Sequence, residues 1–402
     1  MSQTILWNKE IDQIKESGYL NKNISVTDAL IENFYNEILA NEEKLLLKLI
    51  FSNNPSQEEL DNLLKVWDIE VKQGSKSLLL AHFLKTHPEL NATKYEEPRL
   101  KGLLLNLRFK NLQIISHFTK IGKEINKQEI VPIIFNDGLM KYLNPDAPRE
   151  LADMDILVPE KKWVESAKIA KKLGYIFKKL NNFSFDILEK KDALYGILNI
   201  HKFINFETKK ENIWLKDLYK RTTKNEIYGV KVNIPCYEDL IFILLTSISQ
   251  NLRNNKAQSD LLYQIYDCKY LLDNKPNFNW NIIIENAKKT KTEVQINFAI
   301  KFLNKISENI VPEEIRNNIL FEKETNDYSK VVMFKRFYYI DLQKQCREMK
   351  IKDIIKKPKL WWKYITLKIK YKTLKSIQNH PRLIDLFIKD LVKVYNFEEE
   401  DK

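Results

Sequence analysis

A chain of 402 residues is long enough to bury a sizeable core, and we expect it to form two or three structural units. Its three scattered cysteines exclude a disulfide framework and a zinc site, and no apolar run of about 18 residues occurs that would cross a membrane. The net charge of +12 is unevenly placed, and the first residues show no signal-peptide pattern. Only 8 glycines and a high content of Lys, Asn and Ile predict a helix-rich protein, and the other features predict a cytoplasmic one.

The N-terminal region, residues 1–98, is predicted to be helical. Ser56 and Glu59 form a capping box, and apolar residues follow them at helical spacing. Pro98 precedes a predicted long helix, 100–121, that leads into the first strand.

The first predicted strand is the short apolar run 130–135. It is broken by the triplet that ends in Gly138, and a short helix over 139–143 is expected to follow. A loop with two prolines, 144–148, leads from this helix to the second strand.

The second predicted strand carries the most informative pattern in the chain, Asp153-Met154-Asp155 followed by three apolar residues. Because side chains two apart on a strand point to the same face, the two carboxylates would project into one space. Their repulsion must be relieved by a cation, a proton or a basic partner, and Mg²⁺ prefers such oxygen ligands. The plain structural alternative is the polar alternation of a half-exposed strand.

A helix and a third strand are expected to complete this pattern. Pro159 is suited to the first turn of a helix over 160–173, and Gly174 is suited to the position that follows its end. Tyr175 then opens an apolar strand. The predicted order is therefore strand, glycine turn, short helix, Asp-x-Asp strand, helix, strand.

This order resembles the nucleotidyltransferase superfamily related to DNA polymerase β and, more narrowly, the uncharacterised bacterial nucleotidyltransferase family. The similarity covers about residues 100–310. Positions that match the family pattern are Gly138, Arg149, Asp153, Asp155, Leu173-Gly174-Tyr175 and His201. The resemblance implies an α+β fold, in which a small mixed β-sheet is flanked by helical N-terminal and C-terminal regions.

The resemblance also implies roles for these residues. Asp153 and Asp155 would hold Mg²⁺ or Mn²⁺ on the triphosphate of an NTP, and the turn at Gly138 would let the backbone approach the phosphates. Arg149 would clamp the triphosphate or neutralise the Asp pair, the alternative being a plain ion pair with Asp153 or Asp155. His201 would reach a phosphate or the metal, the alternative being a satisfied core residue.

Three positions depart from the family pattern. Asp137 stands where the family has Lys, Leu139 replaces a small residue, and Asn199 stands where the superfamily has its third catalytic carboxylate. An amide brings no charge and accepts no proton at neutral pH, so the site lacks an evident general base. Asp137 and Asp186 are the candidates to replace it.

Beyond Pro235 the pattern is helical again, with helices predicted over 238–252, 259–272, 280–287 and 294–306. The expected organisation is a helical N-terminal region over 1–98, a nucleotidyltransferase-like core over 99–234, a helical domain over 235–320 and a basic helical C-terminal region over 321–402.

The basic region contains one strongly charged segment. Nine lysines and a single acid lie in 351–377, interleaved with tryptophans and tyrosines. A solvated basic helix with a packed aromatic face is the favoured interpretation. Peripheral contact with the inner face of the membrane is the second, and nucleic-acid binding is the third.

Two functions follow from these observations. The first is Mg²⁺-dependent transfer of a nucleotidyl group from an NTP to an unidentified hydroxyl acceptor, which the resemblance connects with surface-polysaccharide metabolism. The second is a catalytically degenerate relative that binds a nucleotide or a partner protein, and Asn199 is the residue that supports it.

Overall fold

The computed structural model describes residues 26–67, 75–92, 96–147, 149–151, 153–180, 184–188, 198–204, 211–254, 258–307, 310–312 and 315. The basic segment 351–377 and the acidic C-terminal end lie outside these residues. The chain divides into two compact units. The first, here called the sheet unit, comprises Leu39–Ile248 and Gln258–Glu293. The second comprises Met1–Ile38, Ser249–Ala257 and Val294–Lys402.

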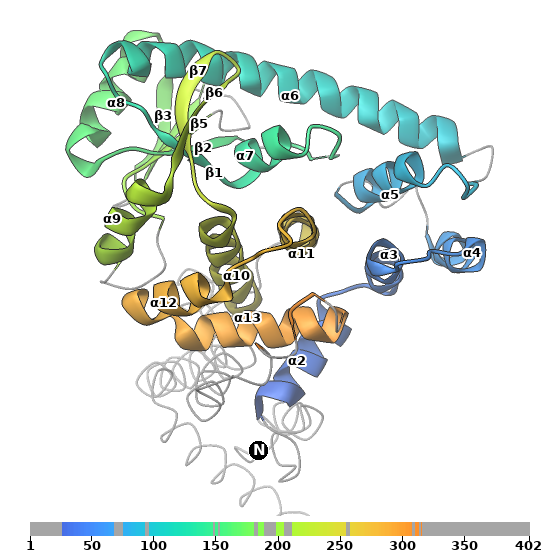
Figure 1. Cartoon of the computed structure of the whole chain (residues 1–402). Coiled ribbons are helices and arrows are strands. Elements are labelled where there is room, and N and C mark those ends of the chain that lie inside the picture. Colours follow the sequence, from blue (N-terminus) through green and yellow to red (C-terminus); the bar gives the residue numbers. More distant parts are fainter. Residues whose placement is uncertain are drawn as a thin grey trace, which may run out of the picture. The chain divides into compact units, whose positions relative to one another are not determined.

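A seven-stranded sheet forms the centre of the sheet unit, in the order β3-β4-β5-β2-β1-β7-β6 (Figure 1). The strands are β1 Ile133–Phe135, β2 Met154–Leu157, β3 Ile176–Leu180, β4 Ser184–Leu188, β5 Leu198–His201, β6 Thr223–Ile227 and β7 Val230–Ile234. The pairs β2–β5 and β1–β7 are parallel and the other pairs are antiparallel. The predicted α+β class with a small mixed sheet is thereby confirmed.

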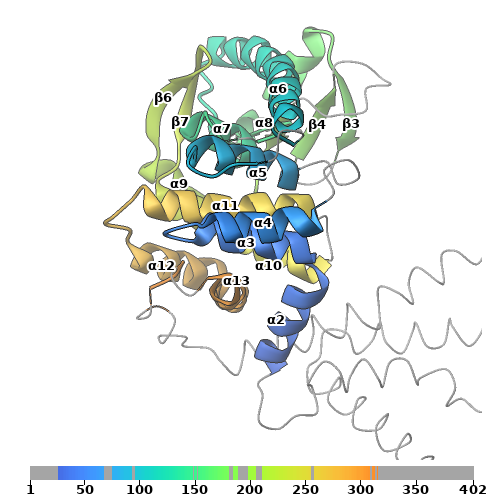
Figure 2. The ribbon, with the colours of Figure 1, turned by 90° about the vertical axis from the view of Figure 1, so that its right-hand side faces the viewer.

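The two ends of the sheet are antiparallel hairpins, which Figure 2 shows on opposite sides of α7. In the β6–β7 hairpin, Tyr228 and Gly229 both have positive φ, 53° and 76°. This two-residue turn suits the right-handed twist of the strands that it joins. The centre of the sheet is formed by β1 and β2, in which every residue is buried.

Two helices, α6 (Glu96–Lys127) and α8 (Glu160–Lys172), pack against the sheet and against each other. α6 is longer than the predicted helix 100–121. α8 begins after Pro159 and gives way to Gly174, which has a φ of +86°. The predicted role of Gly174 as the residue that ends this helix is therefore confirmed.

The remaining helices of the sheet unit lie before, between and after the strands in the chain. They are α3 Asn41–Phe51, α4 Gln57–Val66, α5 Ser75–Thr86, α7 Asn136–Leu143, α9 Glu211–Arg221, α11 Gln258–Asp273, α12 Trp280–Thr290 and the larger part of α10 Tyr237–Asn254. The predicted capping box is present on α4, where the Ser56 side chain accepts from Glu59 N and the Glu59 side chain accepts from Ser56 N. The helices predicted beyond Pro235 all form, with ends shifted by up to three residues.

In the second unit, the described helices α2 (Val26–Glu37) and α13 (Glu293–Ile306) are held by one aromatic pair and two ion pairs. Phe34 and Phe298 meet edge to face with ring centroids 6.0 Å apart. Lys301 pairs with Asp28 at 3.1 Å. Lys305 pairs with Glu32 of α2 at 2.5 Å.

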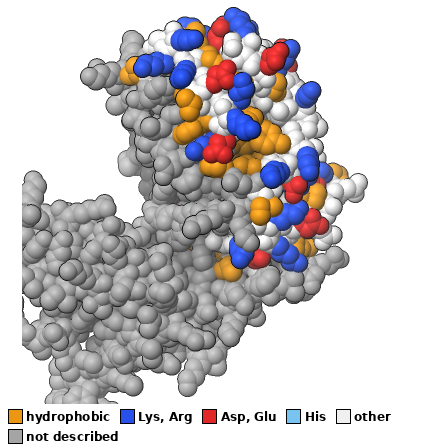
Figure 3. Space-filling model, turned by 90° about the vertical axis from the view of Figure 1, so that its left-hand side faces the viewer, with side chains coloured by type: hydrophobic (Ala, Val, Ile, Leu, Met, Phe, Trp, Pro, Cys, Tyr) orange, Lys and Arg blue, Asp and Glu red, His pale blue; other side chains and the backbone are white. Residues whose placement is uncertain are grey.

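Two observations concern membrane spans and the distribution of charge on one face of the molecule. None of the described helices is long and apolar enough to cross a membrane. On the face shown in Figure 3, Lys and Arg side chains of the described residues are interspersed with Asp and Glu side chains. The excess of positive charge is therefore not gathered on that part of the surface.

Candidate functional site

The Asp pair lies at the start of β2, in the middle of the sheet. Asp153 directly precedes the strand and Asp155 is its second residue. Their neighbours Met154 and Ile156 are fully buried on the opposite face, as strand alternation requires. Asp155 is 8% exposed, and Asp153 is half-buried. The apolar residues around the pair thus fix the strand and aim the carboxylates to the other side.

One amide joins the two carboxylates. Asn199 stands opposite Asp155 in the register of the parallel pair β2–β5. Its Nδ2 donates to Asp153 Oδ2 at 2.8 Å and to Asp155 Oδ1 at 3.1 Å. Because a single nitrogen reaches both, the two carboxylates converge on one point. The residue that replaces the superfamily's third acid therefore lies beside the pair.

His201 belongs to the same cluster. Its Nε2 lies 2.8 Å from Asp155 Oδ1, and its ring meets Phe135 with centroids 5.1 Å apart. In this contact Nε2 must carry a proton in order to donate to the carboxylate. The strand register, which sets His201 opposite Leu157, produces this geometry.

The fourth member, Asn136, was missed by the sequence analysis. It is the first residue of α7, it follows β1 directly, and its φ is 52°. Asn tolerates this left-handed conformation better than most residues. Its Nδ2 donates to Asp155 Oδ2 at 2.9 Å. The signal was an Asn at the end of a buried strand, two residues before the glycine of the turn.

Hydrogen bonds keep Asp155 ionised in spite of its burial. Burial acts to raise the pKa of Asp155, whereas the hydrogen bond and the charge of His201 and the amides of Asn136 and Asn199 act to lower it. The net pKa lies below its usual value. The site therefore presents a buried negative charge supported on both carboxylate oxygens.

Arg149 is almost fully buried and forms ion pairs with Asp137 and Asp267. Its guanidinium carbon lies 4.8 Å from the centre of the Tyr263 ring, and its carbonyl accepts from the side chain of Asn111. Burial acts to lower the pKa of Arg149, but the two carboxylates outweigh it and the net pKa is raised. These contacts join the start of α7 to α11. The acidic partners differ from Asp153 and Asp155, the partners considered from the sequence.

Gly138 is buried in the first turn of α7, where it packs against β2. A Cβ added there would meet Met154 Sδ at 2.6 Å and Met154 Cε at 2.7 Å. The glycine thus allows close approach of the helix to the strand. Its expected contact with phosphates stays a prediction.

The candidates for a third carboxylate are placed differently. Asp137 forms an ion pair with Arg149. The backbone of β4 sets Asp186 at the register position opposite Asn199, and its side chain lies outside the described part of the structure.

The donor set of the site fits a hard cation. Asp153 and Asp155 offer carboxylate oxygens close enough to share one donor, which is the position that a shared divalent ion takes. Among the described residues, no group of three or more His, Cys, Asp or Glu side chains is arranged to hold a metal. A metal at this pair would therefore take its other oxygen ligands from water or from a substrate.

A comparison with known families decides the identity of this arrangement. The family described as "Uncharacterised nucleotidyltransferase" matches residues 73–307, which is more than half of the chain. The chain belongs to this family. In this nucleotidyltransferase-family protein, the matched residues include all seven strands, the Asp pair, Asn136, Asn199 and His201. No curated protein and no solved structure matches the chain.

Proposed function

We propose that the protein transfers a nucleotidyl group from an NTP to an unidentified hydroxyl acceptor, with Mg²⁺ or Mn²⁺ at Asp153 and Asp155. The observation that carries the proposal is the convergence of both carboxylates on Asn199 Nδ2, in a chain of the nucleotidyltransferase family. When bound, the divalent ion would neutralise charge on the triphosphate. The acceptor oxygen attacks the α-phosphorus, the bond to the bridging oxygen breaks, and pyrophosphate leaves in line.

The residues around the pair have positioning roles in this proposal. Asn136 and His201 hold Asp155 through its two oxygens, at 2.9 Å and 2.8 Å. Asp155 is thereby fixed and ionised, whereas the half-buried Asp153 is the carboxylate nearer to solvent. Arg149 is buried in ion pairs, so its role in this proposal is to hold α7 in place. The phosphates would instead be bound by the backbone near Gly138 and by the metal.

Asn199 limits the expected rate. An amide brings no charge and accepts no proton, so the acceptor proton must leave to solvent or to a neighbouring carboxylate. Slow turnover is therefore expected. General acid–base groups typically contribute about 10²–10⁴-fold to a rate, which sets the scale of the loss.

Each α-labelled NTP, incubated with Mg²⁺ or Mn²⁺ and a lysate of the source organism, tests the proposal. Label should appear in a lipid, sugar, RNA or protein fraction, and Asp155→Asn should abolish it. Asp273→Asn, an exposed carboxylate on α11, is the matched control and should label normally. No labelled product with any NTP, under conditions in which the protein is folded, would contradict nucleotidyl transfer.

A second candidate function is a catalytically degenerate protein that binds a nucleotide. The specific observation in its favour is that Asn199 Nδ2 already donates a hydrogen bond to each carboxylate, at the position where the superfamily has a third acid. A wild type that binds NTP but is inactive with all four NTPs, together with an Asn199→Asp variant that gains turnover, would establish this function for the natural protein.

The cellular setting is a further part of the proposal. The resemblance supports a role in surface-polysaccharide metabolism, and the basic segment 351–377 supports peripheral contact with an anionic membrane surface. Cosedimentation with phosphatidylglycerol vesicles should fall when lysines of this segment are replaced by glutamine. Sedimentation with neutral phosphatidylcholine vesicles should be low for both proteins.

A further inference from the structure

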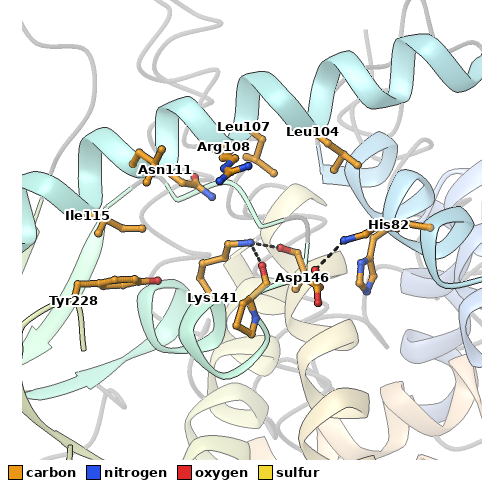
Figure 4. Close-up of a pocket in the computed structure, with 13 residues that line it drawn as sticks. His82, Leu104, Leu107, Arg108, Asn111, Ile115, Lys141, Asp146 and Tyr228 are labelled. Atoms are coloured by element: carbon orange, nitrogen blue, oxygen red, sulfur yellow. Dashed lines mark hydrogen bonds and ion pairs between the residues drawn. The ribbon is translucent and has the colours of Figure 1, made fainter. Parts of the chain in front are cut away.

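A pocket of about 460 Å³ lies in the sheet unit, between α5, α6 and the loop that follows α7. Figure 4 shows Arg108 of α6 facing Lys141 of α7 across this pocket, with Tyr228 at one end and His82 at the other. None of the residues assigned to the Asp pair lines it. Its volume is in the range of small-molecule sites, about 300–1,000 Å³.

The charged residues of the pocket carry an excess of positive charge. Lys85 donates to Asp146 at 2.8 Å, and the Lys141 ammonium donates to the carbonyls of Pro145 and Ala147. Arg108 has no ion pair among the described residues. Lys85, Arg108 and Lys141 therefore stand against one carboxylate, that of Asp146. Burial lowers the pKa of the His82 ring at the other end of the pocket.

The same pocket has an apolar wall on α6. Leu104, Leu107, Leu112 and Ile115 line it at helical spacing. On the neighbouring strip of α6, Leu105 is 57% exposed, Phe109 is 62% exposed and Leu112 is 52% exposed. Leu112 belongs to both sets, so the apolar wall continues onto the surface. Three large apolar side chains on one exposed strip mark a contact surface rather than scattered exposure.

Charge and shape together select the ligand. A phosphate monoester carries about −1.5 to −2 charges at pH 7 and offers oxygens to both Arg108 and Lys141. Its charge matches the uncompensated cations better than the single charge of a carboxylate. An alkyl chain on the phosphate would cover the wall at Leu104 and Leu112.

We propose that this pocket binds a phosphate monoester with an alkyl chain, its phosphate held by Arg108 and Lys141 and its chain lying along α6. The site is separate from the Asp pair. Lys141 follows Asn136, which bonds to Asp155, by five positions on α7, or about 7.5 Å along the helix axis.

Titration calorimetry with octyl phosphate, in the absence of NTP and metal, tests the proposal independently of nucleotidyl transfer. Octyl phosphate should bind at least about tenfold more tightly than inorganic phosphate or octanol, since both its parts gain contacts. Octanoate should bind more weakly than octyl phosphate. Equal binding of octyl phosphate and inorganic phosphate would overturn the proposal.

Variants on the exposed side of α6 assign the contacts without disturbing the core. Arg108→Gln should weaken octyl phosphate binding about fivefold or more. Leu112→Ser should weaken octyl phosphate but leave inorganic phosphate unchanged. Lys168→Gln on α8 removes the same charge outside the pocket and should have no effect. If Lys168→Gln and Arg108→Gln weaken binding equally, the contact is unspecific and the proposal fails.

Vesicles identify the source of the ligand. Capture by vesicles that contain phosphatidic acid, but not by pure phosphatidylcholine, with loss on Arg108→Gln, supports a lipid headgroup. Binding of monomeric octyl phosphate without vesicle capture supports a soluble alkyl phosphate. Absence of both overturns the proposal.

Discussion

Asn199 and Asp155 occupy paired register positions on the parallel strands β5 and β2, and the Asn199 amide nitrogen lies 3.1 Å from Asp155 Oδ1. The same nitrogen lies 2.8 Å from Asp153 Oδ2. An amide donor thus takes the position that a cation takes between paired carboxylates. These hydrogen bonds stabilise the protein in its metal-free state. An aspartate at position 199 would lose them and would add carboxylate repulsion.

Asn199→Asp should destabilise the protein without metal by about 1–3 kcal/mol, because two donated hydrogen bonds are replaced by carboxylate repulsion. Mg²⁺ should restore the loss, since three carboxylates bind it better than two. Thermal unfolding in EDTA and in Mg²⁺ measures both effects. Asn225→Asp on the exposed strand β6 is the matched control and should show no Mg²⁺-dependent rise. A variant as stable in EDTA as the wild type would contradict the electrostatic role of this amide.

Mg²⁺ and NTP should bind more tightly together than either does alone. Two carboxylates hold Mg²⁺ weakly, and the triphosphate supplies its other oxygen ligands. Asp153→Asn and Asp155→Asn should each abolish this synergy, whereas Asp273→Asn should retain it. Calorimetric titration of NTP with and without Mg²⁺ decides the matter. Equal NTP affinities in the wild type would mean that the pair is only a polar strand edge.

The sequence predicted β2, α8 and β3 of this unit well, whereas the triplet 136–138, predicted to be a break before a helix over 139–143, forms the first turn of α7. Alternation in the run around Asp153 and Asp155 is a local property, and the turn signals at Pro159 and Gly174 act through the backbone of neighbouring residues alone. Such local rules specify strand and helix ends with little help from tertiary contacts. The seven-strand order, however, depends on pairing between residues far apart in the chain.

The partners of Arg149 illustrate what the sequence does not predict. Asp267 follows Arg149 by more than a hundred residues, and only the placement of α11 beside the segment that precedes β2 brings the two together. The role of Asn136 was hidden for a related reason. Its amide reaches Asp155 because the antiparallel register sets the end of β1 opposite that residue.

Asn136→Gly and Asn136→Ala should separate the amide contact from the backbone conformation. Both lose the hydrogen bond to Asp155 Oδ2, at about 1 kcal/mol. Alanine adds strain at a φ of 52°, where glycine has none, so Asn136→Ala should be less stable than Asn136→Gly by about 1 kcal/mol. Urea unfolding measures the difference. Helix propensity alone predicts the reverse order, so a more stable alanine variant would contradict the assignment.

Arg149→Met should destabilise the protein by about 3–5 kcal/mol, because it leaves the buried Asp267 without its cation. Adding Asp267→Asn should recover part of this loss. The recovery appears in a double-mutant cycle measured by urea unfolding. Additive losses in the double variant would show that the two side chains do not act as an ion pair. A triphosphate clamp predicts a different result, in which Arg149→Met keeps stability and loses NTP affinity.

Gly138→Ala tests whether this glycine serves packing or phosphate binding. The new Cβ would stand 2.6 Å from Met154 Sδ, so the variant should lose about 1–3 kcal/mol of stability. Met154→Val removes the atoms that clash, and the double variant should therefore be destabilised by less than the sum of the two single changes. Urea unfolding and NTP titration of the same four proteins separate the roles. If packing is the only role of Gly138, the double variant should bind NTP with the affinity of Met154→Val. A stable double variant that has lost NTP affinity would show that Gly138 contributes to phosphate binding.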